Sequence, residues 1–353
     1  MKVLVTGATG FLGQWVTREL HRSGFGIRII ARRPPRSQEL DAMRAEVVQG
    51  DLLVPESLGK AVDGIDAIVH CAGVVSLNPR DRNTMLRANV EGTRNVLEAA
   101  MVRRIRVLHT SSIATIGPTQ GPHPLHEESP SVPLEFDYPY ATSKRDSEAL
   151  VFEYHGRGLD VVVLNPGILF GPGDVNYTST QFVLRYLRRE VWMHLAGGAS
   201  FGDVRDVAAA YPTALSRGRA GQRYILAGAN RTYAQLQEEL RRLTGLHRSM
   251  PLPQPWAEWL ALWSQLGSTL SRHPFEEFNT SVVRWASLFN YCSAQRAQAE
   301  LDYRMRDFSA TLVDTIVDHL KRGAAPASTV ELNALLRRAA PNEAGRDGAR
   351  GTL

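Results

Sequence analysis

Short β-rich runs alternate with longer helical patterns over the first half of the chain, and this alternation restricts the possible folds most. We predict strands at 3–5, 27–31, 46–49, 65–70, 106–110 and 160–164, with helices in most of the intervals between them. Strands that alternate with helices form βαβ units, and these build a parallel sheet. The strands are continuous apolar runs, as expected when helices cover both faces of the sheet. The sequence therefore predicts an α/β protein with a doubly wound parallel sheet.

The pattern changes after about residue 165. A Pro/Gly-rich stretch at 165–174 predicts a loop, and the chain beyond it is expected to be mostly helical and contains all but one of the six tryptophans. We predict a nucleotide-binding core at 1–165 and a smaller, mostly helical substrate-binding region at 166–323, with some chain returning to the core. Residues 324–353 have little apolar pattern and are predicted to be a disordered tail with a short helix near 330–338.

Three glycines, Gly7, Gly10 and Gly13, lie between the first predicted strand and the first helix. Their G-x-x-G-x-x-G spacing differs from the commoner G-x-G-x-x-G, but the physical demands are the same. One glycine permits a tight turn, one lets the backbone approach a pyrophosphate, and one lets helix and strand pack closely. The helix N-terminus then offers free N–H groups to the phosphates. The position directly after the first strand favours dinucleotide binding over a plain tight turn.

The end of the second predicted strand bears on the choice of dinucleotide. An acidic residue there would bind the ribose 2′-hydroxyl of NAD, but the chain has Arg32 and Arg33 in this region. A guanidinium suits a 2′-phosphate, which favours NADP(H) over NAD(H), although a solvated arginine pair is the alternative. Asp51, after the third strand, is placed to accept a hydrogen bond from the adenine amino group. It is almost equally well explained as a turn aspartate.

Tyr140 and Lys144 are four residues apart, which places both side chains on one helix face. A lysine ammonium near a phenol lowers the tyrosine pKa, so such a tyrosine can exchange a proton with a substrate oxygen. Tyr138 has no lysine at the matching spacing, and Pro139 at the helix start leaves Tyr138 outside the first turn. The sequence thus selects Tyr140 as the candidate acid or base.

These features and five other short motifs resemble the extended short-chain dehydrogenase/reductase family. Its dihydroflavonol-reductase-like and 3-beta-hydroxysteroid-dehydrogenase-like members are the most similar. The resemblance covers about the first 210 residues and an ending near 290–319, and it implies a Rossmann-type core. The motifs lie in the family's order: Thr6 to Gly13, Gly50 to Leu52, His70 to Gly73, Asn89 to Thr93, Thr110 to Ser112, Tyr140 to Lys144, and Asn165 to Gly167.

The resemblance implies a catalytic role for four residues. Tyr140 resembles the general acid or base, and Lys144 resembles the residue that binds the nicotinamide ribose and lowers the tyrosine pKa. Ser112 resembles the hydroxyl that positions the substrate oxygen, and Asn89 the residue that anchors a relay water. Simpler explanations remain open: Ser112 could cap a turn, Asn89 could bond nearby backbone, and Lys144 could be a surface residue.

The resemblance also implies a set of cofactor contacts, which Tyr140 and Lys144 share with the catalytic set. Asp206 lies in a segment that resembles a common family segment, but we interpret it as a helix N-cap. No metal site is expected. The predicted cofactor contacts are Gly7, Thr9, Gly10, Phe11, Leu12, Gly13, Arg32, Asp51, Leu52, Ala72, Gly73, Tyr140, Lys144, Pro166 and Gly167.

Two features favour a reductase that acts on a small lipophilic, possibly ring-containing substrate. Asn165 stands before Pro166, where nucleotide-sugar members of the family more often have arginine. A helical stripe near the C-terminus would provide an apolar wall, although core packing or a membrane-surface helix would also explain it. The stripe comprises Trp256, Trp259, Leu260, Trp263, Leu266 and Leu270. The alternatives are an NAD-dependent nucleotide-sugar epimerase or dehydratase and, outside enzymes, a non-catalytic NADP(H)-sensing regulator.

Composition excludes several other classes of function. The formal net charge is +5, but the basic residues are scattered in pairs, so we expect no nucleic-acid partner. No apolar stretch reaches the length of a membrane span, and the chain begins at once with a strand, which leaves no room for a signal peptide. The two cysteines, Cys71 and Cys292, do not make a disulfide framework. We expect a cytoplasmic monomer or homodimer.

Overall fold

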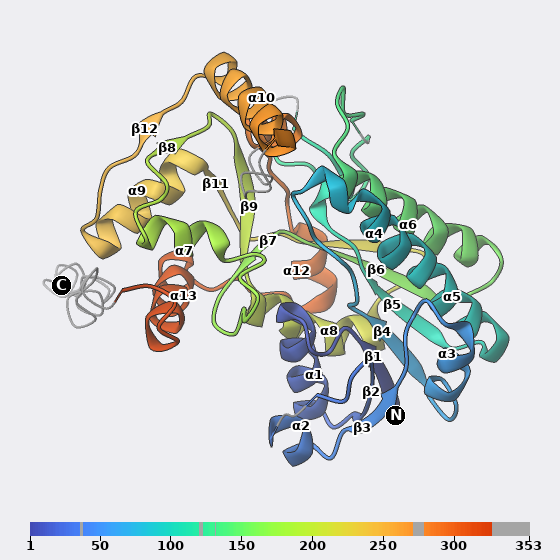
Figure 1. The fold of residues 1–353 in the computed structure, drawn as a ribbon. Coiled ribbons are helices and arrows are strands. Elements are labelled where there is room, and N and C mark those ends of the chain that lie inside the picture. Colours follow the sequence, from blue (N-terminus) through green and yellow to red (C-terminus); the bar gives the residue numbers. More distant parts are fainter. Residues whose placement is uncertain (36–37, 120–122, 131, 271–278, 327–353) are drawn as a thin grey trace, which may run out of the picture.

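A seven-stranded sheet forms the core of one half of the protein (Figure 1). The structure, a computed structural model, describes residues 1–35, 38–119, 123–130, 132–270 and 279–326, with the backbone alone for 39 and 265–270. All neighbouring strands of this sheet are parallel, in the order β10-β6-β5-β4-β1-β2-β3. The strands are β1 (Lys2–Thr6), β2 (Gly26–Ala31), β3 (Glu46–Gln49), β4 (Ala67–His70), β5 (Arg106–Thr110), β6 (Val161–Pro166) and β10 (Arg223–Leu226). The predicted α/β class and parallel sheet are confirmed.

Helices cover both faces of this sheet because its strands are apolar on both sides. In β1, Val3 and Val5 face a cluster with α1 (Phe11–Arg22), α8 (Val204–Arg217) and α12 (Gln295–Leu301). Leu4, which points to the opposite face, joins a second cluster. That cluster contains side chains of α3 (Pro55–Ala61), α5 (Gly92–Arg103) and α6 (Pro139–Gly156). The alternation along one strand thus builds a core on each side.

The second half of the chain contains a sheet that we did not predict, so the expectation of a mostly helical region was incomplete. A four-stranded sheet joins β7 (Ile168–Phe170), β9 (Gly198–Asp203), β11 (Ala229–Thr232) and β13 (Phe289–Asn290). A further pair joins β8 (Met193–His194) to β12 (Met250–Pro251). Phe170 and Phe201 of the four-stranded sheet stack on each other and on Phe308, and the three centroid distances are 5.4, 6.2 and 5.8 Å. Such short strands carry too little periodicity to be recognised in a sequence.

Helices pack on the four-stranded sheet in the second half of the chain, and further short helices lie in the first half. The four-stranded sheet packs against α7 (Gln181–Leu187), α9 (Tyr233–Thr244) and α13 (Phe308–Lys321). Helix α10 (Gln254–Leu270) packs on α11 (Thr280–Ala286) at the outer end of the molecule (Figure 1). Short helices α2 (Gln38–Ala42) and α4 (Arg82–Leu86) lie in the first half, where α4 runs into a π-helical turn at Arg87–Glu91 and then α5.

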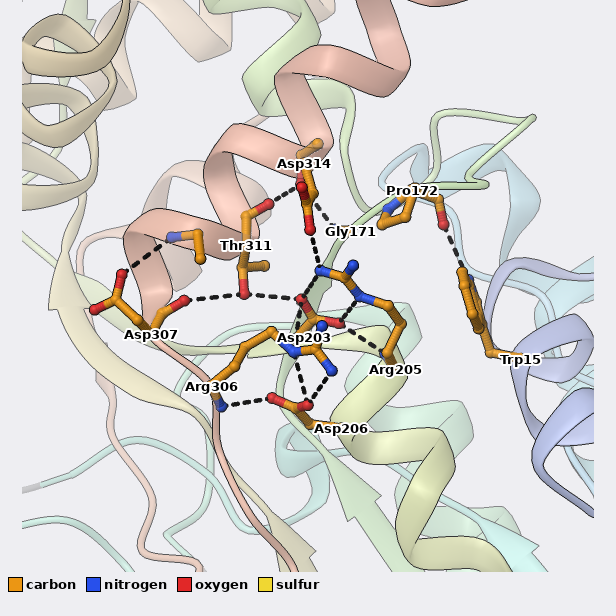
Figure 2. A network of polar contacts seen from close by, with 12 residues as sticks. Trp15, Gly171, Pro172, Asp203, Arg205, Asp206, Arg306, Asp307, Thr311 and Asp314 are labelled. Atoms are coloured by element: carbon orange, nitrogen blue, oxygen red, sulfur yellow. Dashed lines mark hydrogen bonds and ion pairs between the residues drawn. The ribbon is translucent and has the colours of Figure 1, made fainter. Parts of the chain in front are cut away.

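Helix α8 begins where the two sheets meet, and its cap differs from the predicted one. Asp203 is the N-cap and accepts a hydrogen bond from the backbone N–H of Arg205 at 2.8 Å. Asp206 lies in the first turn and accepts instead from the backbone and side chain of Arg306, at 2.7 and 2.8 Å (Figure 2). The assignment of Asp206 as the N-cap was therefore wrong, because the first helical residue is Val204.

Two predictions concern segments that bear on membranes and on the C-terminus. Within the described residues, no helix is both long enough and apolar enough to cross a bilayer. Helix α13 ends at Lys321, and the carbonyl of Ala324 accepts hydrogen bonds from Arg188. The rest of the predicted tail, including the helix near 330–338, lies outside the described residues from 327 onward.

Candidate active site

The glycine loop has the shape that close approach of a phosphate requires. Gly7 has φ +70°, and a Cβ there would lie 2.6 Å from the backbone nitrogen of Ala72. A Cβ on Gly13 would lie 2.0 Å from the carbonyl oxygen of Gly7, so helix α1 can pack on the loop only with glycine there. Gly10 is the N-cap of α1, and no side chain caps this end. The free N–H groups therefore point out of the helix, and the loop fits a dinucleotide pyrophosphate.

A large cleft opens from this loop and runs between the two sheets. Its volume is about 1320 Å³, which exceeds the roughly 300–1,000 Å³ of a typical small-molecule site. The cleft therefore has room for a dinucleotide and a substrate together. Of the predicted cofactor contacts, those that line it are Gly7, Gly10, Phe11, Leu12, Gly13, Gly73, Tyr140, Lys144, Pro166 and Gly167.

The remaining predicted cofactor contacts do not line this cleft. Arg32 is exposed directly after β2, and Thr9 is exposed in the glycine loop. Asp51 accepts a hydrogen bond from the backbone N–H of Leu53 at 3.0 Å, so it has the geometry of a turn aspartate. Leu52 and Ala72 are half-buried next to Asp51 and Gly73. These five assignments stay predictions.

Tyr140 and Ser112 meet in the middle of the cleft, although they lie on different elements. Tyr140 is in the first turn of α6, which begins at Pro139 as predicted. Ser112 follows β5, where its Oγ accepts a hydrogen bond from the backbone N–H of Ala114 at 3.2 Å. Burial raises the pKa of Tyr140, and the hydrogen bond with Ser112 partly offsets that rise. We predicted that Lys144 would lower the pKa of Tyr140, but burial has the larger effect and the pKa is raised. The phenol therefore stays protonated.

Lys144 is a buried site residue and not a surface lysine. Its side chain is 7% exposed, and its Nζ donates to the carbonyl oxygen of Thr110 at 2.8 Å. Burial lowers its pKa to about 8, although Glu148 acts in the opposite direction. The ammonium is therefore poised to lose its proton in weakly alkaline solution.

Asn89 holds one wall of the cleft from the π-helical turn. Its Oδ1 accepts from the backbone N–H of Val74 at 2.7 Å, and its Nδ2 donates to the carbonyl of Val74 at 2.9 Å and to Ser143 Oγ at 3.0 Å. The side chain thus holds the segment after β4 against α6. This agrees with the simpler of the two explanations for Asn89, namely that it bonds to nearby backbone. The π-helical turn is of the kind that often marks functional sites. The role of Asn89 in anchoring a water stays a prediction.

Glu148 supports the site from behind, and we did not predict it. It is 4% exposed, and its Oε2 accepts from Thr115 Oγ1 at 2.9 Å and from Asn165 Nδ2 at 2.7 Å. Asn165 Nδ2 also donates to the carbonyl oxygen of Ser112 at 3.1 Å. The carboxylate therefore fixes the backbone of Ser112 and faces Lys144. The signal was present: Glu148 follows Lys144 by one helical turn.

Three further polar side chains in the cleft wall were also not predicted. Tyr138 stacks on Trp285 with ring centroids 4.9 Å apart and lies edge-on to Tyr140. Asn290 is 2% exposed, and among the described residues neither of its amide atoms has a hydrogen-bond partner. Gln237 donates to the carbonyl of Met193 at 3.1 Å and leaves its Oε1 unpaired within the same set. Isolated Asn and Gln residues in a helical pattern give no signal of this kind.

The fold and this site define a nicotinamide-dependent enzyme class, and comparison with known proteins identifies its family. Residues 3–227 match the model of the NAD dependent epimerase/dehydratase family, and the chain belongs to that family. It is therefore an NAD(P)-dependent oxidoreductase of the extended short-chain dehydrogenase/reductase type, as the sequence motifs predicted.

Relatives match almost the whole chain. A putative dihydroflavonol 4-reductase of Synechocystis sp. is 32% identical over 326 residues, which cover 88% of this chain and 92% of the relative. Sterol demethylase protein B of Methylococcus capsulatus is 30% identical, with 92% and 99% covered. The crystal structure of gox2253 superposes with a TM-score of 0.80 at 29% identity, with 92% and 99% covered. The chain is thus similar to these proteins over its full fold.

Proposed function

We propose that the protein is an NADPH-dependent reductase that reduces a carbonyl group of a lipophilic substrate, with Tyr140 as the proton donor. The observation that carries the proposal is the meeting of Tyr140, Ser112 and Lys144 in a cleft whose outer part is apolar. The apolar part is lined by residues such as Phe182, Leu236, Leu252, Leu260, Trp263, Val282 and Trp285. A substrate that fills it must be largely apolar itself.

The protonation state of the proton-transfer groups supports the reductive direction. Reduction of a carbonyl needs a donor that is protonated at neutral pH, and burial raises the pKa of Tyr140. The hydroxyl of Tyr140 is therefore protonated and can act as the proton donor. Ser112 and Tyr140 hydrogen-bond the carbonyl oxygen, and Tyr140 transfers its proton as negative charge develops there. Lys144, whose pKa is lowered to about 8, then returns a proton toward the phenolate.

The cofactor supplies the hydride when it is bound, and the chain's own residues orient it. The N-terminus of α1 would hold the pyrophosphate, and Lys144 would bind the nicotinamide ribose. The preference for NADPH is supported by Arg32, which is exposed directly after β2 and free to approach a 2′-phosphate. A nucleotide-sugar substrate has less support. Lys144, Arg185 and His194 are the basic side chains among the described cleft residues, and Arg185 is paired with Glu190.

The decisive experiment compares Tyr140→Phe with Tyr138→Phe, since both tyrosines line the cleft. We expect Tyr140→Phe to lower kcat for ketone reduction by roughly 10²–10⁴-fold, the usual contribution of a positioned acid. Tyr138→Phe should retain most activity. The assay uses NADPH oxidation with a panel of cyclic and aryl ketones. Equal activity of the two variants would remove Tyr140 from the proposed role.

A second measurement tests the cofactor and the competing activity. Titration of the protein with NADPH and NADH should give tighter binding of NADPH, and Arg32→Glu should reverse that order. Tighter binding of NADH by the unmodified protein would contradict the role of Arg32. Tightly retained NAD⁺ together with binding of a sugar nucleotide would instead identify an epimerase or dehydratase.

A further inference from the structure

Large apolar side chains gather on the surface at the outer edge of the cleft. Of the sixteen exposed large apolar side chains among the described residues, eight lie in the segments 192–193 and 250–263. We call these eight the apolar rim. Each is between 39% and 64% exposed: Trp192, Met193, Met250, Trp256, Trp259, Leu260, Leu262 and Trp263. Surface apolar residues are normal when scattered, but a contiguous set at a cleft marks a binding surface.

Helix α10 provides most of the apolar rim, and its two faces differ sharply. Ala257 and Ala261 are fully buried against Val283 of α11. On the other side Trp256, Trp259 and Trp263 form a ladder of edge-to-face rings with centroids 6.5 and 5.7 Å apart. The alternative that this stripe is ordinary core packing is therefore wrong for these tryptophans. The side chains of Leu266 and Leu270 lie outside the described residues.

The apolar rim is continuous with the interior of the cleft. Trp192, Met193, Leu260 and Trp263 line the cleft and are also exposed at the surface. Figure 1 shows α10, β8 and β12 together at the end of the molecule farthest from β3. Part of the cleft wall is thus built from side chains of the apolar rim. Trp256 and Trp259 do not line the cleft, so they contact only what lies outside it.

Positive charge flanks the apolar rim. The exposed Arg248 precedes Met250, and the exposed Arg189 precedes Trp192. Glu190 lies between Arg189 and Trp192 and is paired with Arg185 at 3.4 Å. His247 stacks on Trp192 with ring centroids 4.2 Å apart, which brings the two segments together. Glu258, the acidic residue of α10, is neutralised by Arg284 at 3.2 Å. Indole rings bordered by cationic residues match the boundary between acyl chains and anionic headgroups. A second copy of the chain is the competing occupant of such a surface.

We propose that the apolar rim docks the protein on an anionic lipid surface, with the mouth of the cleft facing the bilayer. The proposal that the protein docks on lipid depends only on the apolar rim and its flanking arginines. The consequence that a lipophilic substrate enters the cleft from the lipid rests on the proposed function.

Vesicle flotation of the full chain tests docking. We expect the protein to float with vesicles of phosphatidylcholine and phosphatidylglycerol and to float less with phosphatidylcholine alone, because the arginines require anionic lipid. The double variant Trp256→Ser/Trp259→Ser should lose about tenfold in partitioning, since both indoles are removed. Val102→Ser is the matched control, because Val102 is 81% exposed on α5, outside the rim. Reduction of a water-soluble ketone should be unchanged in both variants.

A second readout needs no variant: brominated lipid in the same vesicles should quench the tryptophan fluorescence of the unmodified protein. Absence of both flotation and quenching, or equal flotation of the double variant, would overturn the proposal. A dimer in light scattering that the double variant converts to a monomer would assign the rim to a second copy instead. Flotation without reduction of any ketone would refute the proposed function and leave docking intact, and the reverse result would refute docking alone.

Discussion

At the scale of single residues, the site depends on burial of a charged group, Lys144, whose burial the sequence alone left open. Lys144 is 7% exposed, donates a hydrogen bond to the carbonyl oxygen of Thr110 and interacts electrostatically with the carboxylate of Glu148. Desolvation disfavours the charged form of a lysine, and a nearby carboxylate favours it. For Lys144 the effect of burial is larger than that of the carboxylate, so its pKa falls to about 8. The ammonium group of Lys144 therefore loses its proton more easily than that of an exposed lysine.

This burial predicts a specific dependence of stability on pH. The pKa of Lys144 is about 8 in the folded protein and has an ordinary value of 10.5. Between these values the unfolded chain binds the extra proton, so stability rises with pH, by at most about 1.4 kcal/mol per pH unit. We expect the unmodified protein to gain stability relative to Lys144→Met as the pH rises from 8 to 10 in urea unfolding. No such gain is expected relative to Lys60→Met, whose lysine is exposed. A constant difference for Lys144→Met would contradict the prediction.

At the scale of elements, helix α8 connects the two halves of the molecule. It follows β9 of the four-stranded sheet and packs its buried face on α1 and β1 of the seven-stranded sheet. Its N-cap, Asp203, also accepts from Thr311 Oγ1 of α13 at 2.8 Å and pairs with Arg205 at 2.7 Å (Figure 2). Burial opposes ionisation of this carboxyl, but the bonds from Arg205 hold its pKa below 3.8.

Removal of the Asp203 charge should therefore destabilise the protein more than a simple cap change. We expect Asp203→Asn to lower the free energy of unfolding by about 3 kcal/mol near neutral pH, because a buried pair loses one partner. Asp307→Asn is the matched control, since Asp307 caps α13 from an exposed position and asparagine is also a good cap. The deficit of Asp203→Asn should shrink as the pH falls below 3.8, because the unfolded chain then takes up a proton that the native carboxylate, with its lowered pKa, does not yet bind. Equal losses in both variants would contradict the prediction.

At the scale of the whole molecule, the cleft is lined by residues of two sheets whose strands come from interleaved chain segments. Strand β10 and helix α12 belong to the second half of the chain, yet they complete the seven-stranded sheet and its cover. The predicted boundary near residue 165 stays a prediction, but chain from both sides of it packs in one core.

Shared packing predicts that cofactor binding stabilises the molecule as a unit. NADP⁺ at a hundred times its Kd should raise the free energy of unfolding by about 2.7 kcal/mol, by mass action on the folded state. Because α8 and α12 join both halves, we expect calorimetry to record one transition that moves as a whole. Two resolved transitions, of which NADP⁺ shifts one alone, would contradict this and would support independent domains.

The sequence by itself determined the parallel sheet, the glycine loop and the selection of Tyr140 beside Pro139. These depend on local periodicity and on residues with few alternative uses, so short windows of sequence contain the information. Only the tertiary structure decided that Ser112 reaches Tyr140, that Glu148 and Asn165 support Ser112, and that Asp203 caps α8. It also decided that the tryptophans of α10 face outward. Contacts between distant segments, and the side of a helix that is left uncovered, depend on how all elements pack together, and no local pattern records that.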